Sequence, residues 1–300
     1  MTASFASTEA SDPRGHDLDL LTTSALIDRL LIHQQHALAA VECARVAIGR
    51  ASEVLAESLR NGGTLHYIGA GTSGRLGVLD AAELPPTFGF DPRRARAYIA
   101  GGARALTRAV EGAEDVGPAG AQVIREAARA GDVLIAISAS GRTPFVLAAV
   151  DEARLLNVQT IALTSDAASP LAARAELAIV TETGAEAIAG STRMGAGTAQ
   201  KVVLSLLSTA AMIQLGYVYQ DAMVDLRATN AKLRLRAVRL VRRFTDLDEP
   251  AAAALLARAD GQVKLAIAME LRGLGVDAAR AELQRAGGRL RAVLDRSCAE

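Results

Sequence analysis

Five short apolar segments alternate with stretches of helical periodicity between residues 64 and 216, and this alternation restricts the fold more than any other feature. The segments lie at residues 64–68, 95–99, 133–137, 159–163 and 177–181. Short apolar strands that alternate with helices are typical of a parallel sheet covered on both faces. We therefore predict an α/β fold of three layers, in which a five-stranded parallel sheet is flanked by helices.

Helical periodicity accounts for most of the remaining chain. We predict a helix over residues 20–60 that ends at Asn61-Gly62-Gly63. Crossover helices are predicted at residues 74–84, from 105–114 toward 130, and at 144–156, 169–174 and 197–216. Residues 229–244 have the pattern of a basic amphipathic helix, and short helices broken by glycines follow. The predicted domains are an N-terminal tail and helices (1–57), a sheet domain (58–222) and a C-terminal helical region (223–300).

The charge balance excludes several classes of partner. Lys and Arg together number 33, as do Asp and Glu, so no overall positive field can hold nucleic acid or an anionic membrane. The arginines of 229–244 could bind anions, but a solvated helix face is the simpler interpretation. Residues 1–15 lack a signal-peptide pattern. The apolar run 202–219 contains Ser205, Ser208, Thr209 and Gln214, so we expect a buried helix and a cytoplasmic protein.

Cysteine and histidine form no metal-ligand or disulfide pattern. Cys43 and Cys298 are the two cysteines and lie near opposite ends of the chain. The four histidines are not spaced as ligands either. We therefore expect neither a bound metal ion nor a disulfide.

A glycine-rich loop, Gly69-Ala70-Gly71-Thr72-Ser73-Gly74, follows the first predicted strand and opens a helix. Gly71 and Gly74 let backbone N–H groups approach a phosphate, and Thr72 and Ser73 add hydroxyl donors. The loop also matches the dinucleotide fingerprint G-x-G-x-x-G, which requires an acidic residue at the end of the second strand. Ala100-Gly101-Gly102 follows that strand instead. A terminal phosphate is therefore favoured over NAD.

A second hydroxyl-rich loop follows the third predicted strand, and Pro144 begins the helix after it. The residues of this loop that could hold a phosphate are Ser138, Ser140, Gly141, Arg142 and Thr143. A serine or threonine at such a place can simply cap a helix, but one cap explains only one hydroxyl. Loops that follow neighbouring strands converge at one edge of a parallel sheet. We therefore predict that both loops bind one phosphorylated small molecule.

Several carboxylates are candidates for acid–base chemistry near this edge. Glu83 closes the first crossover helix before Leu84-Pro85-Pro86, where we expect proline to turn the chain. Glu114 lies in an acidic cluster (111–115) beyond the second strand, and Glu186 follows the fifth strand. A solvated surface position is the alternative for each of the three.

Longer strings around these residues resemble one family, the N-acetylmuramic acid 6-phosphate etherases of the sugar-isomerase (SIS) domain superfamily. The resemblance covers nearly the whole chain. Its strings are E-L-P-P-T-F-G at 83–89, V-E-G-A-E-D at 110–115, the two hydroxyl-rich loops, and residues 184–201 and 223–230. The first two strings are the most specific, because generic SIS domains lack them.

The resemblance implies an activity and an assembly. It implies a cofactor-independent lyase that cleaves the D-lactyl ether of N-acetylmuramic acid 6-phosphate to N-acetylglucosamine 6-phosphate and D-lactate, in the recycling of cell-wall amino sugars. It also implies a homodimer whose sites are lined partly by the second subunit.

The resemblance also implies roles for individual residues. Glu83 falls on the family's proton-donor position and Glu114 on its second catalytic carboxylate. The sugar-phosphate loops of the family correspond to Ser73, Ser138, Ser140 and Thr143. Glu186 is a weaker candidate, through similarity to the loop that carries an acid–base glutamate in sugar-phosphate isomerases of the superfamily.

The chain departs from the family pattern in two places. Gly195 stands where family members usually have lysine, which removes a cation from beside the site. His33-Gln34-Gln35-His36 replaces a more acidic stretch, and we expect this change to concern the N-terminal helices only.

The implied reaction explains why two carboxylates are needed. In the open-chain sugar the C1 aldehyde acidifies the C2 proton, the lactyl oxygen on C3 can leave by elimination, and water then adds back. We hypothesise that Glu83 is the acid and Glu114 its partner. Like-charged neighbours and partial burial are expected to raise the pKa of one of the two glutamates.

Three other functions share part of these features. An aldose–ketose isomerase would use the same fold, loops and C2 chemistry without releasing lactate. A sugar-phosphate sensor would bind without turnover, and a Rossmann dehydrogenase would bind NAD(P).

Overall fold

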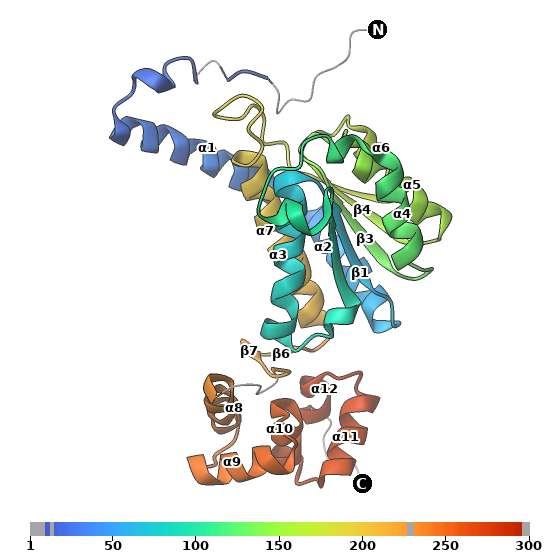
Figure 1. Cartoon of the computed structure of the whole chain (residues 1–300). Coiled ribbons are helices and arrows are strands. Elements are labelled where there is room, and N and C mark those ends of the chain that lie inside the picture. Colours follow the sequence, from blue (N-terminus) through green and yellow to red (C-terminus); the bar gives the residue numbers. More distant parts are fainter. Residues whose placement is uncertain (1–9, 13–14, 227–230, 296–300) are drawn as a thin grey trace. The chain divides into compact units, whose positions relative to one another are not determined.

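The computed structural model describes residues 10–12, 15–226 and 231–295. The chain forms two compact units. We call the first, Met1–Ala82 with Pro92–Ser208, the sheet unit, and the second, Glu83–Asp91 with Thr209–Glu300, the C-terminal unit. Figure 1 shows the elements of both.

The sheet unit is built around five parallel strands. They are β1 (Leu65–Gly69), β2 (Ala95–Ile99), β3 (Val133–Ile137), β4 (Gln159–Thr164) and β5 (Leu177–Val180). Their order is β2-β1-β3-β4-β5. Every residue of β1 and of β3 is buried, as expected for central strands that are covered on both faces. The predicted strands are confirmed to within one residue at each end.

Helices cover both faces of this sheet, which confirms the predicted three layers (Figure 1). On one face lie α4 (Gly117–Ala127), α5 (Pro144–Leu155) and α6 (Pro170–Arg174), and Val146 and Ala149 of α5 share a buried cluster with Leu134 of β3. On the other face lie α2 (Arg45–Arg60), α3 (Gly71–Phe88) and α7 (Gly195–Gln214). At Gly77 of α3 a Cβ atom would lie 3.0 Å from Cβ of Tyr67, so this helix packs closely on β1.

The N-terminal helical region differs from its prediction. Two helices, α1 (Thr23–Cys43) and α2, replace the single helix predicted over residues 20–60. They are separated at Ala44, whose ψ of 1° interrupts the helical conformation. No glycine or proline lies at this position, so the local sequence contains no signal for the break.

The helix after β1 runs further than predicted. We expected it to end near Leu84 before Pro85 and Pro86, but α3 continues through both prolines to Phe88. Proline has no N–H, so the carbonyls of Ala81 and Ala82 lose their usual helical partners. The helix resumes beyond them, since the N–H of Gly89 donates to the Pro85 carbonyl at 2.8 Å. The boundary between the two units falls at this weakened point, between Ala82 and Glu83.

The long helix predicted from 105–114 toward 130 is wrong in its first half. The chain forms two short 3₁₀ helices, η5 (Gly102–Leu106) and η6 (Ala113–Asp115), before α4 begins. Gly101, Gly102 and Gly112 have φ values of +84°, +64° and +71°. Such positive values are incompatible with a continuous right-handed helix.

Helix α7 is long and apolar enough to cross a membrane by length and composition. In the structure 56% of its apolar window is buried within the protein, and Val203, Leu207 and Ala211 are fully buried. This agrees with the predicted buried helix.

The C-terminal unit is helical, as predicted. Its helices are α8 (Ala231–Phe244), α9 (Glu249–Arg258), α10 (Val263–Arg272), α11 (Val276–Arg285) and α12 (Leu290–Leu294). A two-stranded antiparallel ribbon of β6 (Val218–Tyr219) and β7 (Ala222–Met223), which we did not predict, precedes them. The described arginines of α8 are exposed, which favours the solvated helix face. The predicted start of this helix at Thr229 lies outside the described residues, as do residues 227–230 of the family string.

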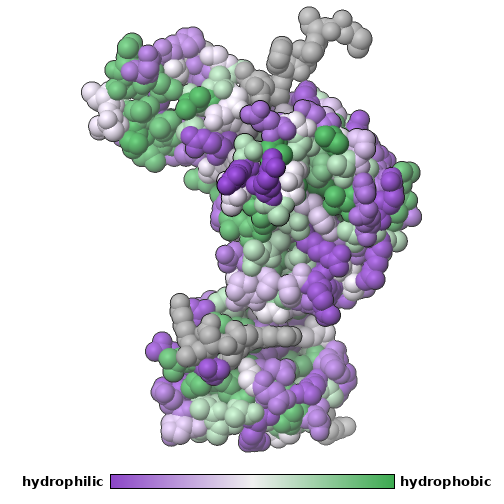
Figure 2. All heavy atoms as spheres, in the orientation of Figure 1, coloured by the Kyte–Doolittle hydropathy of each residue, from purple (hydrophilic) through white to green (hydrophobic). Residues whose placement is uncertain are grey.

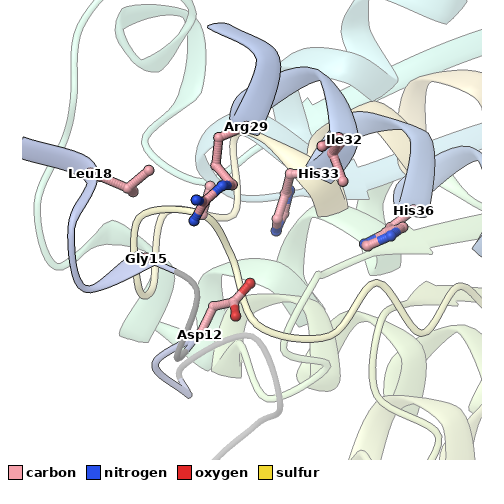
Figure 3. A pocket seen from close by; sticks show the side chains of 8 residues that line it. Asp12, Gly15, Leu18, Arg29, Ile32, His33 and His36 are labelled. Atoms are coloured by element: carbon pink, nitrogen blue, oxygen red, sulfur yellow. The ribbon is translucent and has the colours of Figure 1, made fainter. Parts of the chain in front are cut away.

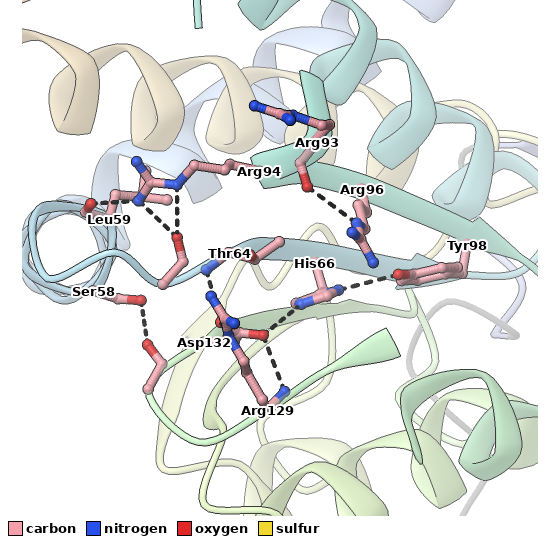
Figure 4. A network of polar contacts seen from close by, with 12 residues as sticks. Ser58, Leu59, Thr64, His66, Arg93, Arg94, Arg96, Tyr98, Arg129 and Asp132 are labelled. Atoms are coloured by element: carbon pink, nitrogen blue, oxygen red, sulfur yellow. Dashed lines mark hydrogen bonds and ion pairs between the residues drawn. The ribbon is translucent and has the colours of Figure 1, made fainter. Parts of the chain in front are cut away.

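A buried polar network joins the amino ends of β1 and β3 (Figure 4). Asp132 accepts hydrogen bonds from the backbone N–H groups of Thr64 and Arg129, at 2.8 and 3.0 Å. Its second oxygen also lies 3.0 Å from Nε2 of His66, and Nδ1 of that ring lies 3.2 Å from the Tyr98 hydroxyl. Because the carboxylate only accepts, Nε2 carries the proton and Nδ1 accepts from Tyr98. Burial lowers the pKa of His66 from its ordinary 6.5, although hydrogen bonding to Asp132 opposes the shift.

Candidate active site

The first hydroxyl-rich loop is held tightly between the end of β1 and the start of α3. A Cβ atom at Gly69 would lie 2.7 Å from the Gly74 nitrogen, and one at Gly74 would lie 2.6 Å from Ile99. Gly71 has a φ of +54° and begins the helix. These approaches require glycine and leave Thr72 half-buried at the helix N-terminus, where a phosphate is favoured.

Ser73 in this loop is buried and already bonded. Its hydroxyl donates to Oε1 of Gln200 on α7 at 2.9 Å, and Gln200 is 1% exposed. The loop is therefore joined to the first turns of α7.

The second loop closes on itself in a similar way. The hydroxyls of Ser138 and Thr143 lie 2.9 Å apart, and the N–H of Gly141 donates to the Ser138 hydroxyl at 3.1 Å. Gly141 has a φ of +63°, and a Cβ atom there would lie 2.4 Å from that of Ser169. Since Gly69 of β1 is in register with Ile137 of β3, the two loops leave neighbouring strands at the same level.

The charge of Arg142 is partly neutralised within the protein. Its guanidinium donates to the Asp166 carboxylate at 2.5 Å and to the Ser140 carbonyl at 2.9 Å. The Ser140 hydroxyl accepts from the Arg142 backbone N–H at 3.3 Å. Arg142 therefore shapes the loop, and binding of phosphate by its side chain stays a prediction.

Glu186 is fully buried and caps α7. Its two carboxylate oxygens accept hydrogen bonds from the backbone N–H groups of Gly195 and Ala196, at 2.8 and 2.9 Å. A carboxylate at a helix N-terminus satisfies otherwise unpaired N–H groups and complements the helix dipole. Both oxygens are therefore engaged in holding the loop before α7.

The two departures from the family pattern meet in space. We expected His33-Gln34-Gln35-His36 to concern the N-terminal helices only, and this expectation is wrong. A Cβ atom at Gly195 would lie 2.8 Å from Cε1 of His33, and the Gln34 side chain accepts from the Thr198 hydroxyl at 2.5 Å. The middle of α1 therefore packs on the first turn of α7.

The first turn of α7 also reaches the first hydroxyl-rich loop. A Cβ atom at Gly197 would lie 3.4 Å from Cγ2 of Thr72. Together with the bond between Ser73 and Gln200, this contact brings α1, α7 and the β1–α3 loop into one region of the sheet unit.

Four buried side-chain atoms near the carboxyl end of the sheet have no hydrogen-bond partner among the described residues. They are Nδ1 of His33, Oγ of Ser165, Oγ1 of Thr183 and Nε2 of Gln200. Ser165 directly follows β4, and Thr183 follows β5. Buried polar groups are normally paired, so these atoms are candidates for contact with a ligand. Sequence reasoning missed them, although a hydroxyl directly after a strand was the same signal that identified Ser138.

The structure places Glu83 and Glu114 in different units. Glu83 lies on α3 just before the two prolines, and Glu114 lies in η6 after Gly112. Both side chains are exposed. The partial burial that we expected to raise the pKa of one glutamate is therefore absent in the described chain.

Over the described ranges, no group of three or more His, Cys, Asp and Glu side chains could hold a metal ion. Cys43 is a free, exposed thiol, and Cys298 lies outside the described residues.

Comparison with known proteins identifies the family. The SIS domain family matches residues 34–165. The N-acetylmuramic acid 6-phosphate etherase of Symbiobacterium thermophilum is 51% identical over 259 residues, 86% of each chain. The protein of the same name from Deinococcus radiodurans is 48% identical over 289 residues, 96% of this chain and 94% of that one. A phosphoheptose isomerase structure from Francisella tularensis covers 64% of this chain and 98% of its own, with 21% identity and a TM-score of 0.49. Because identity of 48% to a curated relative extends over 96% of its length, the chain belongs to the N-acetylmuramic acid 6-phosphate etherase family.

Proposed function

We propose that this protein cleaves the lactyl ether of N-acetylmuramic acid 6-phosphate to N-acetylglucosamine 6-phosphate and D-lactate. The observation that carries the proposal is identity of 48% over 96% of the chain to a protein of that name. The two tight hydroxyl-rich loops at one edge of the sheet suit the phosphate of such a substrate. The reaction belongs to the recycling of cell-wall amino sugars, in the cytoplasm.

The phosphate is held by backbone N–H groups and hydroxyls rather than by a free cation. The first loop contributes the Thr72 hydroxyl and the backbone N–H of Ser73 at the N-terminus of α3, since the Ser73 hydroxyl donates to Gln200. Ser138, Ser140 and Thr143 serve from the second, which the Arg142–Asp166 ion pair keeps in shape. Such donors recognise a phosphate by geometry as well as by charge.

Glu83 and Glu114 move the protons. One carboxylate removes the acidic C2 proton of the open-chain sugar, and one acid protonates the lactyl oxygen as it leaves C3. Water then adds to the double bond, and the group that delivered the proton acts as its base. Since both side chains are exposed in the described chain, we infer that bound substrate and a second subunit supply the desolvation that this chemistry requires.

A homodimer completes this proposal. Helix α1 presents Ile27, Leu31, Ile32 and Leu38, each about half exposed at 46–55%. Figure 2 shows hydrophobic residues gathered on this helix. An exposed apolar helix face of this kind marks a protein interface. Light scattering should give twice the chain mass, and Leu31→Asp should shift the protein toward the monomer.

Incubation with N-acetylmuramic acid 6-phosphate in deuterated water tests the function. We expect D-lactate to be released and deuterium to appear at C2 of the product sugar. Glu83→Gln should lower the rate by about 10²–10⁴-fold, the usual contribution of general acid–base catalysis. Interconversion of a ketose phosphate without lactate release would instead indicate an isomerase, and binding without turnover would indicate a sensor.

A further inference from the structure

His33 has one nitrogen in use and one free. The imidazole is 6% exposed, and its Nε2 lies 2.8 Å from the carbonyl oxygen of Ala185. A carbonyl oxygen only accepts hydrogen bonds, so Nε2 carries the proton and Nδ1 of the neutral ring is an acceptor. Nδ1 is buried and has no partner within the described part of the chain. An unsatisfied buried acceptor costs about 1–3 kcal/mol, and one in a native structure calls for an explanation.

The His33 side chain lines a pocket (Figure 3). The pocket encloses about 290 Å³, part of it open to solvent. Its lining residues are Asp12, Gly15, Leu18, Arg29, Ile32, His33, His36 and Ala187. Arg29 in this lining is ion-paired with Asp17 at 3.5 Å. A small ligand in the pocket would lie against the His33 ring, whose Nδ1 has no partner in the described chain.

The position of His33 connects it to the candidate phosphate site. A Cβ atom at Gly195 would lie 2.8 Å from Cε1 and 3.2 Å from Nδ1 of the ring. The same atom would lie 3.1 Å from Oε2 of Glu186. Two residues along, Gly197 approaches Thr72 of the first hydroxyl-rich loop. The ring therefore occupies the space of a side chain at position 195, beside the loop expected to hold the phosphate.

We propose that His33 binds the sugar part of the substrate, with Nδ1 accepting a hydrogen bond from a sugar hydroxyl, and that residue 195 is glycine to make room for the ring. The inference deepens the proposed function and rests on it for the ligand. The chemistry selects the partner: a fully ionised phosphate or a carboxylate has no hydrogen to donate to Nδ1, whereas every sugar hydroxyl has one. His33 thereby distinguishes a sugar phosphate from a bare anion.

Nitrogen-15 NMR of histidine-labelled wild-type protein tests this contact, with His33→Gln used only to assign the signal. The Nδ1 resonance of His33 should move when N-acetylglucosamine 6-phosphate is added. It should stay in place when sulfate is added, because sulfate has no hydrogen to donate. A resonance that ignores the sugar phosphate would overturn the proposal, and so would one that moves equally with sulfate alone.

Two variants test the energetic role. In His33→Gln the amide NH₂ can still donate to the Ala185 carbonyl, but the Nδ1 acceptor is gone. We expect the Kd for N-acetylglucosamine 6-phosphate to rise roughly three- to tenfold, as for loss of one hydrogen bond. KM for the substrate should rise to the same extent with little change in kcat, while the Kd for sulfate stays unchanged. His33→Asn, which keeps a polar group near Nδ1 but cannot reach Ala185, should bind the sugar phosphate more tightly than His33→Gln.

Gly195→Ala probes the same space from the other side, with Gly49→Ala as its control. A Cβ atom at Gly49 would have nothing within 4 Å, whereas one at Gly195 would push on the ring. Sugar-phosphate binding should weaken in the first variant only, and equal behaviour of the two would contradict the steric part of the proposal.

If the wild-type protein binds N-acetylglucosamine 6-phosphate through His33 but releases no lactate, the etherase function fails and the sugar contact stands. If lactate is released and His33→Gln has the same Kd and KM as the wild type, the sugar contact is contradicted and the etherase function stands.

Discussion

The two ends of the sheet in the sheet unit use buried polar groups in opposite ways. At the amino end, Asp132, His66, Thr64 and Tyr98 satisfy one another in a closed network. At the carboxyl end, His33, Ser165, Thr183 and Gln200 each keep a buried atom without a partner in the described chain. Asp132 and His66 at one end are as buried as Ser165 and Gln200 at the other, at 0–1% exposed, so burial alone does not explain the difference.

The difference indicates that buried polar groups stabilise the fold at the amino end of the sheet and do not do so at the carboxyl end. A satisfied buried network rigidifies the fold, whereas an unsatisfied atom costs stability until a ligand supplies its partner. The amino end therefore holds β1 and β3 together, and the carboxyl end retains the unsatisfied atoms around the hydroxyl-rich loops. Four predictions test this contrast between the two ends.

The largest effect is expected from Asp132→Ala at the amino end. It leaves two backbone N–H groups and the His66 ring without their acceptor in a site that is 1% exposed. We expect a loss of about 3–5 kcal/mol in the free energy of unfolding, measured by urea denaturation. The rate of lactate release per folded molecule should be unchanged, and a selective loss of activity would contradict the division between the two ends.

Gly141→Ala tests the backbone of the second hydroxyl-rich loop. The new methyl would overlap Ser169 at 2.4 Å and would impose a φ of +63° on alanine. We expect a cost of about 2–4 kcal/mol, together with weaker phosphate binding. Gly62→Ala, which has a φ of +90° but nothing within 4 Å, should cost only about 1–2 kcal/mol. A similar loss in both variants would show that strain, and not the Ser169 contact, dominates.

The pH dependence of stability isolates His66. Its pKa is lower in the folded protein than the ordinary 6.5, mainly because of burial. The unfolded chain therefore binds the proton more readily, so the contribution of this group is complete above about pH 6.5 and is lost as the pH falls toward the folded pKa. The slope is at most about 1.4 kcal/mol per pH unit. His66→Gln should flatten the stability curve in this range, whereas His16→Gln at an exposed position should leave it as in the wild type.

The smallest change in stability is expected from Ser165→Ala at the carboxyl end. This hydroxyl is fully buried and its oxygen has no partner in the described chain, so its removal should leave the free energy of unfolding within about 1 kcal/mol or raise it. KM for the substrate should increase. Ser52→Ala, which removes a buried hydroxyl bonded to the Ile48 carbonyl at 2.8 Å, should show the reverse: lower stability and unchanged KM.

The strands and the two hydroxyl-rich loops could be predicted because their signals are local. A run such as Val133–Ile137 is apolar throughout, and a parallel sheet covered on both faces is the arrangement that buries it. Gly71, Gly74 and Gly141 likewise indicated loops whose backbone could approach a phosphate before any contact was known. The positions of Glu83 and Glu114 came from strings that resemble a family.

The sequence predictions were wrong or incomplete where tertiary contacts outweighed a local rule. Proline was expected to end the helix near Leu84, but α3 continues to Phe88. Arg142 and Glu186 carried the expected charges, but partners distant in sequence engage them, Asp166 for the arginine and the first turn of α7 for the glutamate. Such pairings depend on which segments meet, and periodicity contains no information on that.

The sequence by itself determined the layered fold, the two hydroxyl-rich loops and the family, because side-chain periodicity and glycine positions act over a few residues. Only the tertiary structure decided that His33 fills the space beside Gly195 and that Asp132 joins the amino ends of two strands. Residues 33 and 195 lie far apart along the chain. Their contact exists because α1 and α7 pack together, and that packing is fixed by the shape of the whole core.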